Sequence, residues 1–113
     1  MIPVRDLKLF QKSYDFYEEV YPTLKNFPQS ERFVMVQKIQ DSFLDFISHI
    51  ISARKASNTL HYLRKADREL EKTKIFFRLS RDLGFISAGQ HENISEDLVE
   101  LGKMLGGWID SEK

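Results

Sequence analysis

The sequence has 113 residues, of which 42% are hydrophobic and 30% charged, a size that suits one hydrophobic core but not two ordinary domains. Seventeen Lys and Arg residues balance seventeen Asp and Glu, so the chain lacks the strong positive charge of most free-standing nucleic-acid-binding proteins. Cysteine is absent, which excludes disulfides, thiolate metal sites and cysteine nucleophiles. Residues 1–6 show no basic region followed by an apolar run, and no segment has the roughly 18 apolar residues of a membrane span. We therefore expect a cytoplasmic protein that does not enter the membrane.

The first predicted helix covers residues 6–24. Its apolar residues recur every three or four positions, which predicts one buried stripe made of Leu7, Phe10, Tyr14, Tyr17, Tyr21 and Leu24. Pro22 removes a backbone donor and disfavours helix at the preceding residue, so we expect the helix to end near residue 24.

The second predicted helix covers residues 30–54, after a start signal at residues 28–31. Its buried stripe is predicted to contain Val36, Ile39, Phe43, Phe46 and Ile50. Four further apolar residues, Phe33, Leu44, Ile47 and Ile51, widen this stripe. A helix with such a broad apolar face is expected to contact two or three neighbours.

The third and fourth predicted helices cover residues 58–83 and 87–109. The third has a stripe of Leu63, Ala66, Leu70, Thr73, Phe77 and Ser80, and Gly84 offers a left-handed stop. The fourth starts with a capping box from Ser87 to Gln90 and continues with His91, Ile94, Leu98, Leu101, Leu105 and Trp108. Connections of a few residues favour antiparallel neighbours, so residues 1–113 are predicted to form a single all-α, up-down-up-down antiparallel four-helix bundle.

Motifs for catalysis are missing from the sequence. Dinuclear metal sites in bundles use Glu-x-x-His pairs, but Phe46, Asn58 and Ala88 stand three residues before the three histidines. No phosphate-binding glycine loop or nucleophile elbow occurs. We expect no metal, no cofactor and no enzymatic activity; the alternative is a bundle enzyme with an unfamiliar site.

The zero net charge conceals an asymmetry. Residues 57–84 carry seven basic and four acidic side chains, whereas residues 85–113 carry two basic and six acidic ones. The basic residues of the third helix are therefore the candidates for binding phosphate groups: Arg64, Lys65, Arg68, Lys72, Lys74, Arg78 and Arg81. The alternative is that they pair with acids of the fourth helix and with Asp67, Glu69 and Glu71, without a functional role.

The third helix also has apolar residues outside its core stripe, namely Ile75, Phe76, Leu79 and Leu83. Apolar surface flanked by arginine is a common interface composition, so we predict that these residues pack against another subunit. Gly106 allows either fraying of the last turn or close approach of a partner subunit.

Three segments resemble a known family: 27–33 (FPQSERF), 83–87 (LGFIS) and 102–109 (GKMLGGWI). They are similar to the accessory variability determinant proteins of diversity-generating retroelements, which are four-helix bundles. The SERF part is shared with a related family, the bundle proteins encoded in intervening sequences of ribosomal RNA genes. The resemblance extends over nearly the whole chain.

This resemblance implies a non-catalytic helper that forms a homopentamer and binds a reverse transcriptase with its template RNA or cDNA, in support of mutagenic cDNA synthesis. It makes Arg64, Arg68, Lys72, Arg78 and Arg81 candidates for contacting RNA or polymerase. It likewise makes Ile75, Phe76, Leu79 and Trp108 candidates for packing. Because the chain is neutral, the polymerase could supply most RNA contacts. The alternative is an intervening-sequence-type bundle that acts as a helical interaction module without a polymerase partner.

Overall fold

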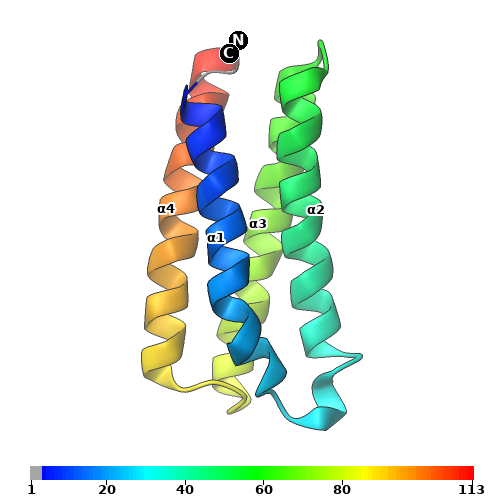
Figure 1. The fold of residues 1–113 in the computed structure, drawn as a ribbon, viewed down its shortest axis with the longest axis vertical. Coiled ribbons are helices and arrows are strands. Elements are labelled where there is room, and N and C mark those ends of the chain that lie inside the picture. Colours follow the sequence, from blue (N-terminus) through cyan, green and yellow to red (C-terminus); the bar gives the residue numbers. More distant parts are fainter. Residues whose placement is uncertain (1–3) are drawn as a thin grey trace.

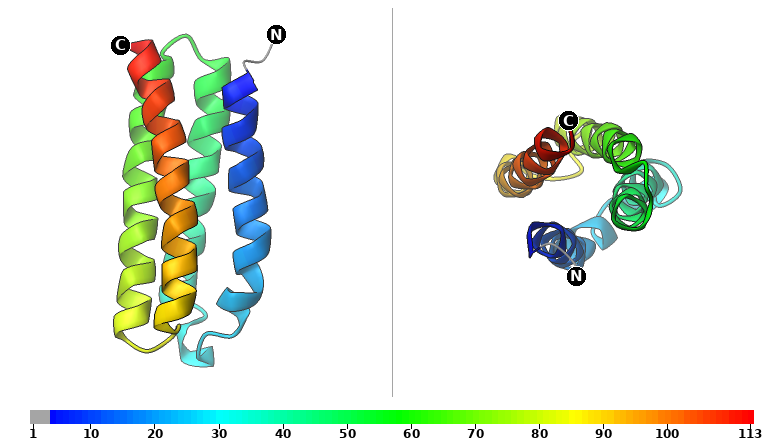
Figure 2. Two further views of the ribbon diagram at one scale, coloured as in Figure 1. Left: turned by 90° about the vertical axis from the view of Figure 1, so that its left-hand side faces the viewer. Right: turned by 90° about the horizontal axis from the view of Figure 1, so that it is seen from above.

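The computed structural model describes residues 4–113, with side chains from residue 7 onward; residues 1–3, part of the predicted domain, lie outside the described residues. Within these residues the helices are α1 (Val4–Lys25), α2 (Met35–Lys55), α3 (Thr59–Asp82) and α4 (Ala88–Glu112), with a short 3-10 helix, η1 (Gln29–Glu31). Each helix runs antiparallel to the next, and both ends of the chain lie at the same end of the bundle (Figure 1). Viewed along the bundle, the helices follow one another around a common axis (Figure 2). The predicted all-α, up-down-up-down four-helix bundle is confirmed.

The core stripes of α2, α3 and α4 are the predicted ones. The buried members are Val36, Ile39, Phe43, Phe46 and Ile50 in α2, Leu63, Ala66, Leu70, Thr73, Phe77 and Ser80 in α3, and Ile94, Leu98, Leu101, Leu105 and Trp108 in α4. His91, the first predicted member in α4, is only half-buried. These three helices therefore bury the faces that their apolar spacing selects.

The buried stripe of α1 differs from the predicted one. Leu9, Ser13, Phe16, Val20 and Leu24 face the core, whereas Leu7, Tyr14 and Tyr21 are 50%, 51% and 43% exposed. The helix carries two stripes, and the one that contains Ser13 is buried because the Ser13 hydroxyl donates a hydrogen bond to the Leu9 carbonyl at 2.7 Å. The tyrosines of the other stripe keep their polar ends in water. Of the predicted stripe only Leu24 is fully buried.

Helix α2 begins five residues later than predicted, at Met35 instead of residue 30. The start signal at residues 28–31 forms η1, and Val34 then leaves the helical region, with φ −119° and ψ −94°. This break lets Met35 and Val36 enter the core while Phe33 points into solvent, 79% exposed. Leu44 and Ile51, expected to touch neighbouring helices, are also exposed, at 44% and 39%.

The connection from α3 to α4 matches its predicted signals. Gly84 has φ +82°, a conformation that favours glycine, and the Phe85 amide donates to the Ser80 carbonyl at 2.8 Å. The Ser87 hydroxyl accepts from the Gln90 amide, and the Gln90 side chain accepts from the Ser87 amide. This capping box fixes the start of α4.

The packing of α2 against α3, the closest in the bundle, includes one buried polar pair. The hydroxyls of Ser42 and Thr73 lie 2.8 Å apart, and each also donates to a backbone carbonyl of its own helix. Since both side chains are satisfied, this polar contact is compatible with a buried position.

Candidate functional site

The outward surface of α3 combines basic and apolar residues in a single row. Its members are spaced by three or four positions and are all exposed: Arg64, Arg68, Lys72, Ile75, Leu79 and Leu83. We call this row the outer face of α3. Its half near the α2–α3 connection is basic, and its half near Gly84 is apolar, with Ile75 and Leu83 more than half exposed. The structure thus brings three of the predicted phosphate-binding residues next to three of the predicted packing residues.

Two other predicted basic residues, Lys74 and Arg81, lie beside α4 instead. The Lys74 ammonium lies over Gly102, 3.2 Å from where a β-carbon would stand. Arg81 bonds the Asp82 carboxylate at 2.7 Å and lies 3.4 Å from Nδ1 of His91. Arg81 and His91 therefore form a polar contact between the C-terminal end of α3 and the first turn of α4.

The electrostatics of this contact favour a neutral imidazole. Burial lowers the pKa of His91 below its ordinary value, and the positive charge of Arg81 lowers it further. Its Nε2 lies 3.1 Å from the Ser95 hydroxyl, so a neutral ring can accept from Arg81 and donate to Ser95. The hydrogen bond from Arg81 also lowers the pKa of Asp82.

Ion pairs do not neutralise α3 in the way that the alternative required. Among the side chains that the structure describes, no ion pair joins α3 to α4. Lys72 pairs with Glu69 at 3.0 Å, and Lys12 of α1 pairs with Glu100 of α4 at 3.0 Å. Lys65 lies over the Tyr62 ring, 5.7 Å from its centroid. The acidic surface of α4 and most of the basic surface of α3 consequently face solvent separately.

The predicted packing residues divide into three groups. Ile75, Leu79 and Leu83 are exposed, and Phe76 is half-buried against the core. Trp108 is a correction: it is 3% exposed and belongs to the core of its own chain, so it does not offer a subunit surface. Its predicted role came from a resemblance, which does not reveal which side of a helix faces inward.

Gly106 provides a test of close approach by a second subunit. A β-carbon at Gly106 would meet no atom within 4 Å, so Gly106→Ala should stabilise the isolated chain by about 0.5–1 kcal/mol, the usual gain for replacing glycine within a helix. Gly107→Ala, with equally open space, is the control. If a subunit packs over Gly106, only Gly106→Ala should weaken association in light scattering. Equal association of both variants would assign Gly106 no interface role.

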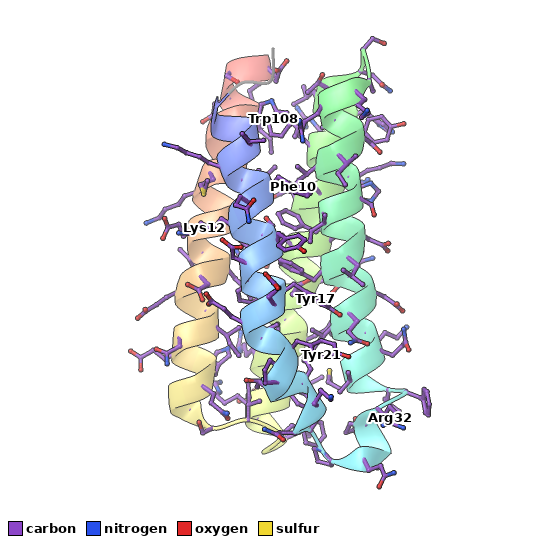
Figure 3. The ribbon with its side chains drawn as sticks, in the orientation of Figure 1. Phe10, Lys12, Tyr17, Tyr21, Arg32 and Trp108 are labelled. Carbon is purple, nitrogen blue, oxygen red and sulfur yellow. The ribbon has the colours of Figure 1, made fainter. Side chains whose placement is uncertain are left out.

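Sequence reasoning missed a groove between α1 and the start of α2. It has a volume of about 480 Å³ and is lined by Tyr21, Leu24, Lys25, Phe27, Pro28, Gln29, Arg32, Phe33, Val36, Gln37 and Gln40. Figure 3 shows Tyr21 on α1 and Arg32 in the connection below α2, at the same end of the bundle. The available signal was the unusual number of tyrosines in α1, which the sequence analysis placed in the core.

The structure contains neither a metal-ligand cluster nor a membrane-spanning helix within the residues it describes. No three His, Cys, Asp or Glu side chains among residues 4–113 are grouped so that they could hold a metal ion. Over the same residues, no helix has the length and apolar character to cross a membrane.

The fold and its surfaces define a small helical-bundle protein whose notable features are exposed faces. Residues 7–112 match the family described as bAvd-like, and the chain belongs to this family. Its fold is similar to the crystal structure of a protein of unknown function from the S23 ribosomal protein family of Bacteroides thetaiotaomicron. The TM-score is 0.85 at 24% identity, over 95% of this chain and 99% of the other. No curated protein matches the sequence.

Proposed function

We propose that this protein is a non-catalytic accessory protein of a diversity-generating retroelement. It assembles into a homo-oligomer, a pentamer by the resemblance described above, and acts in the cytoplasm. It binds the reverse transcriptase and the template RNA or cDNA, and thereby supports mutagenic cDNA synthesis. Membership of the bAvd-like family over residues 7–112 is the observation that carries this proposal.

The outer face of α3 supports a binding role. Arg64, Arg68 and Lys72 present three cations on one side of the bundle, and the exposed apolar residues Ile75 and Leu79 continue the row. Cations in such a row suit phosphate groups of RNA, and apolar residues flanked by arginine suit a protein surface. The polymerase and its RNA could therefore contact adjacent parts of one helix.

Removing the three cations should weaken RNA binding without affecting the fold. We expect Arg64→Ala combined with Arg68→Ala and Lys72→Ala to reduce affinity for template RNA, alone or with reverse transcriptase, and to lower the salt slope of log K by about 0.7–0.9 per lost phosphate contact. The measurement is fluorescence anisotropy at several salt concentrations. The melting temperature should change little because exposed charges contribute little stability.

The matched control removes three exposed lysines from other helices, Lys8, Lys38 and Lys103, with the same change in net charge. An equal loss of affinity in both triple variants would mean that only net charge matters. Unchanged affinity in the α3 variant would remove its outer face from the proposal.

A bundle that works as an interaction module without a polymerase is the second candidate, and the zero net charge favours it. Co-purification with the reverse transcriptase separates the two candidates, since only the accessory protein should retain it. Light scattering tests the assembly: a native mass of about 66 kDa, five times 13.3 kDa, is expected for a pentamer. A mass near that of one chain at low and high salt would exclude a closed ring.

A further inference from the structure

We propose that the groove between α1 and the start of α2 binds nucleotides of single-stranded RNA by stacking bases on Tyr21 and Phe33. This inference rests on the proposed function, because it names a second place where the template RNA is held. It concerns a surface separate from the outer face of α3, so the two can be tested independently.

The aromatic rings of this groove are available to a ligand. Tyr21 is 43% exposed, and Phe33 is 79% exposed on the turn between η1 and α2. Leu24, Phe27 and Val36, all buried, supply the apolar floor. The core is therefore complete without Phe33, and an aromatic ring held in water is available for a flat partner.

The charge of the groove selects an anionic partner. Lys25 and Arg32 are both cations, and none of the lining residues is a carboxylate. The Lys25 ammonium lies over the Tyr21 ring, 5.7 Å from its centroid, so a cation and an aromatic face occur together. A nucleotide has the complementary features, a phosphate for Lys25 or Arg32 and a flat base for the rings.

Side-chain amides add groups that can bond the edges of a base. Gln29, Gln37 and Gln40 line the groove, and each amide can both donate and accept. The volume of about 480 Å³ falls within the range of small-ligand sites, roughly 300–1,000 Å³. Single-stranded RNA meets these requirements better than a duplex, because its bases are free to leave the strand and stack on aromatic side chains.

The aromatic row also continues along α1. The Tyr17 ring lies 6.0 Å from the Tyr21 ring, and Phe10 and Tyr14 form a second pair with centroids 6.2 Å apart. Figure 3 shows Phe10, Tyr17 and Tyr21 following one another along α1. The exposed stripe of α1 could thus guide further bases away from the groove.

The test compares substitutions of Phe33 in the full-length protein. The probe is a fluorescein-labelled 12-nucleotide single-stranded RNA, with the same sequence as a duplex for comparison. Stacking contributes about 1–3 kcal/mol per base, so Phe33→Leu should weaken single-strand binding about 5- to 150-fold. Phe33→Trp should retain it, and its indole fluorescence should respond to RNA. Because Trp108 is buried, the native tryptophan should respond little.

Val34→Ala is the matched control, since Val34 is the exposed neighbour of Phe33 without an aromatic ring. If Phe33→Leu binds RNA as well as wild type while the α3 triple variant loses affinity, the groove is excluded and the proposed function stands. If Phe33→Leu instead loses only reverse transcriptase binding, the groove belongs to a protein and the RNA assignment is wrong. If wild type binds no free single-stranded RNA, both the groove and direct RNA binding fail.

Discussion

Phe43→Ala should lower the free energy of unfolding by about 3–5 kcal/mol, the usual range for removing a buried phenyl ring. Phe43 is 1% exposed and lies at the centre of an aromatic cluster. Its ring centroid is 5.0 Å from Phe16, 5.4 Å from Phe46 and 6.2 Å from Tyr17. The variant loses the buried surface of the ring and several aromatic contacts that join α1 to α2. Urea unfolding followed by circular dichroism measures the loss.

The matched control is Phe33→Ala, the same substitution at a position that is 79% exposed. It should change stability by less than about 0.5 kcal/mol, as expected for a surface position. Similar losses in the two variants would contradict the burial of Phe43 and the exposure of Phe33. The comparison also confirms that Phe33 variants are folded when their RNA binding is measured.

Trp108→Ala should also lower the free energy of unfolding by about 3–5 kcal/mol. Trp108 is 3% exposed, and its indole N–H lies 3.3 Å from a Glu112 carboxylate oxygen. Because Trp108 belongs to the core of one chain, the loss should not depend on protein concentration. Thermal unfolding at several concentrations measures both the size and the concentration dependence.

Trp108→Phe is the control, since it keeps most of the apolar volume and should lose no more than about 1.5 kcal/mol. A destabilisation by Trp108→Ala that appears only at concentrations where the protein associates would contradict the monomer core and return Trp108 to a subunit interface. An unchanged melting temperature would mean that the indole is not buried.

The spacing of apolar residues predicted the fold and most of the core. In α3 and α4 a single stripe of apolar residues stands out, bounded by Gly84 and by the Ser87 cap, so the buried face is unambiguous. In α1 two stripes share one helix, and the one with more large residues is the exposed one. Periodicity identifies amphipathic faces but does not identify which of two faces meets the core.

The candidate site was predictable to a different degree for each surface. The outer face of α3 follows from the spacing of Arg64, Arg68 and Lys72, because residues three or four positions apart share a face. The groove beside Tyr21 and Phe33 was not predictable. It depends on the break at Val34, where tertiary packing of Met35 and Val36 overrides a local helix signal.

The order of residues along the outer face of α3 separates its two chemistries in space. At 1.5 Å per residue, the exposed Leu83 lies about 28 Å from Arg64, more than three Debye lengths at physiological ionic strength, which are about 8 Å each. Salt screening should therefore weaken binding at the arginine end while apolar contacts at the leucine end persist, and sulfate should strengthen the latter. An ionic-strength titration would then read the two ends of one helix as two independent contacts, one that is lost and one that remains.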